Sequence, residues 1–166
     1  MTDARAAASA QAIIRHDALA GAVANAVINA GISAAMLRGS GPHLLTVDSI
    51  AAREHTILGS AVTLALSLGL IVGSITFFTF RRKARVLGLA RPDLVERPYF
   101  FFGLGRALLA ALTMAAFVVF AAVLWQRFVG SVAVSTPAAA ALTGLVAGVT
   151  AWHVSTRTSR ALLTPL

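Results

Sequence analysis

The sequence contains no cysteine, which excludes disulfide bonds, zinc sites with cysteine ligands and thiol catalysis. Charge is also scarce, because only 12% of the 166 residues are charged, against about 25% in an average soluble domain. Hydrophobic residues make up 58% of the chain, and its mean hydropathy is +0.82. These values exclude an ordinary soluble domain and predict a membrane protein.

The formal net charge of +8 raises the question of a nucleic-acid partner. Seven of the 14 basic residues, however, lie between Arg81 and Arg106, in the interval between two hydrophobic runs. Membrane topology accounts for that position, and no motif for binding RNA or DNA accompanies it. We therefore expect no nucleic-acid partner.

Four segments are long and apolar enough to cross a membrane, which takes about 20 apolar residues. The predicted fold is an all-α four-helix bundle, a single membrane domain over residues 1–166. An alternative for the first segment is a cleaved signal peptide, but its length and its two asparagines favour a retained span. The predicted spans cover residues 18–37, 56–80, 107–125 and 137–154.

The distribution of basic residues predicts the orientation of the spans. Eleven lie in the N-terminal segment, the loop of residues 81–106 and the C-terminal tail, and three lie in the other two connections. Both termini are therefore expected in the cytoplasm of a bacterium, with the protein in its cytoplasmic membrane.

The loop of residues 81–106 mixes basic residues with the aromatic run Tyr99–Phe102. This combination is typical of a segment at the headgroups of an anionic leaflet, so we expect anionic lipid as a partner. Docking of an unidentified membrane partner is the alternative. The residues expected at the membrane surface are Arg81, Arg82, Lys83 and Arg85.

The stretch "NAVINAG" places two carboxamides, Asn25 and Asn29, inside an apolar run. They share a helix face with Ser33, because residues four apart are neighbours on a helix. Unsatisfied amides are costly in hydrocarbon, so both must point inward. Either they hydrogen-bond neighbouring helices, or they form the wall of a small polar cavity with Thr63 and Ser67 opposite.

Two further spans carry pairs of glycines at four-residue spacing. Such pairs let helix backbones approach closely where lipid removes the hydrophobic drive for packing. We expect helix packing at Gly69, Gly73, Gly144 and Gly148.

Histidines at the predicted ends of spans raise two further possibilities. His16 and His153 should lie at the same cytoplasmic depth, which is a requirement for a b-type haem in a helical bundle. On the outer side, His43 and His55 with Asp48 or Glu54 could form a metal site. We nevertheless expect no metal and no resident cofactor.

Sequence motifs of catalysis are missing. The chain has no nucleophile elbow, zinc-protease, Walker or paired intramembrane aspartate motif. Glu54 beside His55 has no identifiable nucleophile with it, so we expect no enzyme. No ionisable side chain lies deep in a span either, which disfavours proton coupling.

The segments "NAVINAGISA" and "LLTVDSIA", with the second span ending in "RRK", resemble small bacterial inner-membrane proteins. Such proteins are sometimes labelled permease. The resemblance covers roughly residues 13–83 and implies a four-helix membrane protein, without a substrate or site.

These observations lead to three hypotheses of function. The first is a small permease- or channel-like protein, acting as a homo-oligomer, expected to be a dimer, because one four-helix bundle leaves little room for a path. The second is a membrane subunit or scaffold whose polar residues only pack helices. The third is a haem-binding electron-transfer subunit.

Overall fold

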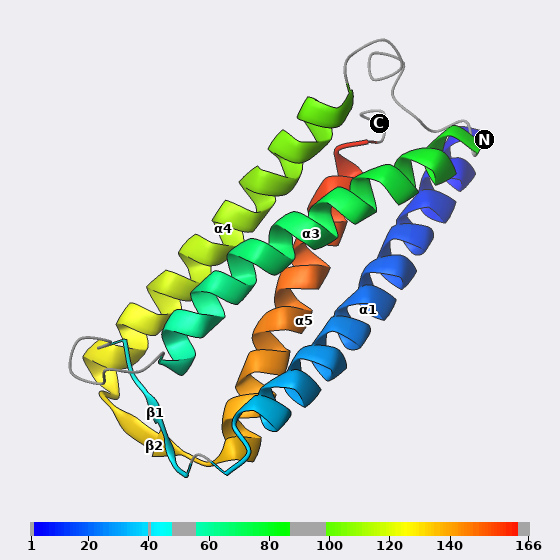
Figure 1. Cartoon of the computed structure of the whole chain (residues 1–166). Coiled ribbons are helices and arrows are strands. Elements are labelled where there is room, and N and C mark those ends of the chain that lie inside the picture. Colours follow the sequence, from blue (N-terminus) through cyan, green and yellow to red (C-terminus); the bar gives the residue numbers. More distant parts are fainter. Residues whose placement is uncertain (1, 40, 48–55, 87–98, 163–166) are drawn as a thin grey trace.

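The computed structural model of the chain describes residues 2–39, 41–47, 56–86 and 99–162 (Figure 1). Within these residues lie four long helices, each long and apolar enough to cross a membrane. The predicted all-α fold with four such helices is confirmed for the part of the chain described. The helices are α1 (Thr2–Met36), α3 (Ile57–Val86), α4 (Tyr99–Phe128) and α5 (Thr136–Arg160).

The helices extend beyond the apolar runs from which they were predicted. Helix α3 continues to Val86, so Arg81, Arg82, Lys83 and Arg85 form its last turns and do not lie in a loop. The physical reason is that arginine and lysine are good helix formers, so a helix does not end where hydrophobicity ends. Helix α4 likewise begins at Tyr99. Residues 87–98 of the predicted loop lie outside the described residues.

The four helices do not all pack against one another to the same extent (Figure 1). Helix α1 packs chiefly on α5, whereas α3 packs on both α4 and α5. Helices α1 and α3 approach each other mainly where α1 begins and α3 ends. We call this end, where α1 and α4 begin and α3 and α5 end, the basic end of the bundle.

Helices α1 and α5 are held together by small residues. A Cβ atom added at Gly144 would lie 2.7 Å from the backbone oxygen of Ala26, a distance that real Cβ atoms do not show. One added at Gly148 would lie 3.1 Å from the Cβ of Ala26. Ser33 continues this contact by donating a hydrogen bond to Thr143 Oγ1 at 3.3 Å. The two backbones therefore pack at van der Waals distance, as small residues permit in membrane bundles.

The second glycine pair occupies the contact between α3 and its neighbours. A Cβ atom at Gly69 would lie 2.9 Å from the Cβ of Ala111 on α4. At Gly73 it would lie 2.7 Å from the Cβ of Ala107 and 2.9 Å from Val154 on α5. These two glycines thus lie where three helices meet.

The opposite end of the bundle carries a short antiparallel pair of strands that the sequence did not predict. Strand β1 (His43–Leu45) pairs with β2 (Val132–Val134), with Leu44 opposite Ala133. Gly130, with a φ of 82°, lets the chain turn out of α4 into β2. We call this end of the bundle the ladder end.

Side-chain hydrogen bonds join the two connections at the ladder end. Thr46 donates to Gln126 Oε1 at 3.1 Å, and Ser131 donates to Thr46 Oγ1 at 3.0 Å. The backbone N–H of Val47 also donates to Gln126 Oε1, at 3.2 Å. Residues 48–55, which include Asp48, Glu54 and His55 of the metal site considered and not expected, lie outside the described residues.

Candidate ligand cavity between α1, α3 and α5

The two asparagines bond to their own helix. Asn25 Nδ2 donates to the backbone oxygen of Gly21 at 2.8 Å, and Asn29 Nδ2 donates to that of Asn25 at 2.9 Å. This four-residue back-bonding is a known use of short polar side chains in helices. Among the described residues neither carboxamide hydrogen-bonds another helix. They therefore do not act as hydrogen-bonding contacts between helices, and the oxygen of each carboxamide is left to accept another bond.

Asn25 lines a cavity of about 540 Å³ that lies between α1, α3 and α5. Asn29, one turn further toward the ladder end, is not among its lining residues. The walls combine apolar side chains with hydroxyls, a carboxamide and one ion pair. The lining is formed by Asp17, Ala18, Ala20, Gly21, Asn25, Leu68, Ile71, Val72, Ile75, Thr76, Thr79, Phe80, Lys83, Ser155 and Ser159.

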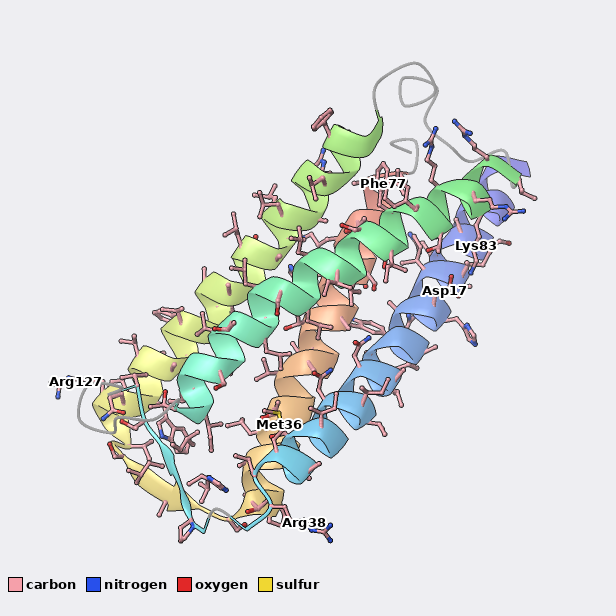
Figure 2. All side chains as sticks on the ribbon, viewed as in Figure 1. Asp17, Met36, Arg38, Phe77, Lys83 and Arg127 are labelled. Atoms are coloured by element: carbon pink, nitrogen blue, oxygen red, sulfur yellow. The ribbon has the colours of Figure 1, made fainter. Side chains whose placement is uncertain are left out.

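An ion pair lines the cavity at the basic end. Lys83 Nζ of α3 donates to Asp17 Oδ2 of α1 at 2.5 Å. Figure 2 shows the two residues side by side, at the end of the bundle opposite Arg38 and Arg127. Both side chains remain about half exposed, at 51% and 40%. Lys83, expected from the sequence only at the membrane surface, thus also belongs to the cavity.

Helix α5 contributes two buried serines to the cavity wall. Ser155 and Ser159 are 8% and 4% exposed. The hydroxyl of Ser155 lies 3.2 Å from Thr76 Oγ1 of α3, so one hydrogen bond joins the two helices at the wall. Because serine hydroxyls both donate and accept, this wall suits a solute that carries polar groups of either kind.

The expectation that Thr63 and Ser67 lie opposite the asparagines is wrong. Neither is among the residues that line the cavity, whose α3 wall begins at Leu68. Both are exposed, and each donates to the backbone four residues earlier, at 3.4 and 2.8 Å.

The two histidines considered for haem occupy different environments. The side chain of His16 is 84% exposed and lies 3.7 Å from the carboxylate of Asp17. His153 Nε2, by contrast, is buried and has no hydrogen-bond partner among the described residues. His43 Nε2 lies 3.2 Å from Thr136 Oγ1, at the ladder end.

Sequence reasoning missed part of the cavity for identifiable reasons. The predicted fourth span stopped at Val154, so Ser155 and Ser159 were not considered as residues inside the bundle. Their four-residue spacing is the signal that could have placed them on one face. Asp17 lies eight residues before Asn25, on the same helix face. Nothing in the sequence, however, identified Lys83 as its partner.

The four helices meet the length and composition expected of a polytopic helical membrane protein. Three of them line a partly polar cavity, and small residues pack at the contacts between helices. Comparison with models of known protein families, with curated proteins and with solved structures gave no match.

Proposed function

We propose that this chain is an integral protein of a bacterial cytoplasmic membrane, with both termini in the cytoplasm. Basic side chains support this orientation, because they concentrate at one end of the bundle. The basic end carries Arg81, Arg82, Lys83, Arg85, Arg106, Arg157 and Arg160, and the ladder end carries Arg38 and Arg127.

We propose further that the protein is permease- or channel-like and holds a small polar solute in the cavity. The observation that carries this proposal is the partly polar cavity of about 540 Å³. Deeper than the Asp17–Lys83 pair, its polar lining groups are the carboxamide of Asn25 and hydroxyls. An uncharged or zwitterionic solute therefore suits it better than a lone ion, since a lone ion needs a compensating charge in a low-dielectric site.

The cavity reaches only part of the way across the bundle. Its lining residues extend from Asp17 and Lys83 at the basic end to Asn25 and Leu68. A complete route would need a second copy of the chain to extend the path. The homodimer is retained as part of this proposal.

Thiol accessibility tests the proposal, and the chain has no native cysteine to give a background. Asn25→Cys and Thr76→Cys place the thiol in the cavity, whereas Ser67→Cys places it at an exposed position outside the cavity lining. Labelling with a membrane-impermeant maleimide is measured in intact cells and in inverted vesicles. A water-accessible cavity predicts labelling of the first two variants and protection of the third. Equal protection of all three would rule out the proposal.

A scaffold without a solute is the second candidate, and the glycine contacts favour it. Gly144, Gly148, Gly69 and Gly73 lie at helix contacts, which accounts for these small residues without any ligand. Under this alternative the cavity is filled by lipid chains, and the maleimide labels neither cavity position. The same experiment therefore separates the two candidates.

A further inference from the structure

A second hollow lies between α1 and α3, further toward the basic end than the solute cavity. It has a volume of about 860 Å³ and mostly apolar walls, with basic side chains among them. The Asp17–Lys83 pair borders both hollows. We call this one the interfacial groove. Its lining residues are Ala12, Ile13, His16, Asp17, Thr79, Arg82, Lys83 and Val86.

The position of the groove along the helices corresponds to lipid headgroups. The apolar run of α1 begins at Ala18, and that of α3 ends at Phe80. The groove is formed by residues 12–17 of α1 and 79–86 of α3, which adjoin these two ends. In the proposed orientation the groove therefore faces the inner leaflet, where anionic lipids attract basic side chains.

Arg82 supplies the charge that an anion would contact. Its side chain is exposed, and among the described residues it has no hydrogen-bond or ion-pair partner. Lys83, in contrast, is already paired with Asp17. A guanidinium presents several donors in a planar fork that matches a phosphate. Arg81 and Arg85, on the same turns of α3, add to the positive potential.

We propose that the interfacial groove binds one anionic phospholipid. Its phosphate lies on Arg82, and the apolar part of the lipid adjoining the headgroup lies against Ala12, Ile13 and Val86. The apolar walls favour a lipid over free phosphate, since a free anion gains nothing from them. This inference depends on the proposed membrane orientation but not on a solute in the neighbouring cavity.

Binding at this position would have a structural consequence. Helices α1 and α3 are in contact mainly at the basic end, through the Asp17–Lys83 pair and the packing of Ile14 on Phe77 and Phe80. A lipid lying between them adds a contact to both helices in the folded state only. Ligands that bind only the folded state raise its stability in proportion to the logarithm of their concentration.

The test compares thermal unfolding of the purified protein in detergent with added phosphatidylglycerol or phosphatidylcholine of identical acyl chains. Phosphatidylglycerol should raise the melting temperature, and Arg82→Gln should weaken its apparent affinity about tenfold, as expected for loss of a charge-assisted hydrogen bond. Arg160→Gln is the matched control, since Arg160 is an exposed arginine at the same end, outside the groove. It should respond as the unmodified protein does.

A second variant tests the apolar wall. Val86 is 83% exposed, so Val86→Asn should fold normally and bind phosphatidylglycerol more weakly. Equal stabilisation by both lipids, or an unchanged response in Arg82→Gln, would overturn the proposal. So would equal stabilisation by glycerol 1-phosphate without lipid, because that result assigns the groove to a free phosphate. Protection of the cavity cysteines from maleimide leaves these predictions unchanged, so the two proposals can fail separately.

Discussion

Lys83 near the end of α3 and Asp17 of α1 form an ion pair that joins two helices with little other contact along their length. The pair lies between the solute cavity and the interfacial groove, and it borders both. One electrostatic contact thus lies between the proposed solute site and the groove at the basic end.

Breaking this pair should open the cavity without unfolding the bundle. Asp17→Asn removes the carboxylate charge, and because both side chains are partly exposed the loss of stability should be about 0.2–1 kcal/mol. Labelling of Thr76→Cys from the cytoplasmic side should become faster in this background. The reciprocal exchange, Asp17→Lys with Lys83→Asp, should return the labelling rate toward its original value. An unchanged rate in Asp17→Asn would show that the pair does not restrict access.

Asn25 and Asn29 should affect the access of water to the cavity more than the stability of the helix bundle. Because each carboxamide bonds its own helix, replacing Asn25 and Asn29 together by leucine should leave the melting temperature in detergent nearly unchanged. Of the two, Asn25→Leu makes the cavity wall more apolar, which favours dewetting. Labelling of Thr76→Cys should therefore slow. A large drop in melting temperature with unchanged labelling would instead support a purely structural role.

The contact between α1 and α5 should not tolerate a larger residue. In Gly144→Leu the new side chain meets the backbone of Ala26, which lies 2.7 Å from the position of the added Cβ. Overpacking of this kind costs about 1–3 kcal/mol. Gly105→Ala is the control, since nothing lies within 4 Å of the Cβ it would add. In thermal unfolding, Gly144→Leu should lower the melting temperature clearly, whereas Gly105→Ala should leave it unchanged.

Gly103 should be coupled to Phe77. A Cβ added at Gly103 would overlap Cδ1 of the fully buried Phe77 ring, so Gly103→Ala should destabilise the bundle by about 1–3 kcal/mol. In a Phe77→Leu background the smaller side chain leaves room, and the added cost of Gly103→Ala should fall. Strictly additive losses in this double-mutant cycle would contradict the contact.

Much of the fold followed from patterns that are local in the sequence. Apolar runs separated by charged segments predicted four long helices, because length and hydropathy are properties of each segment alone. The same holds for the glycine pairs, whose four-residue spacing places both members on one helix face. The residues that these glycines contact on neighbouring helices could not be predicted from the sequence. Ala26 and Gly144, for example, are brought together only by the docking of α1 on α5.

The sequence by itself determined that four long apolar helices form and that Asn25 points inward, since each rests on composition or on helical periodicity. Only the tertiary structure decided which helix faces pack against one another. It left Thr63 and Ser67 exposed and outside the cavity lining, because the rotation of a helix depends on the helices it packs against. It also brought Asp17 to Lys83 and joined Ser155 to Thr76, and it paired β1 with β2. These contacts connect residues far apart in the chain, so no local pattern specifies them.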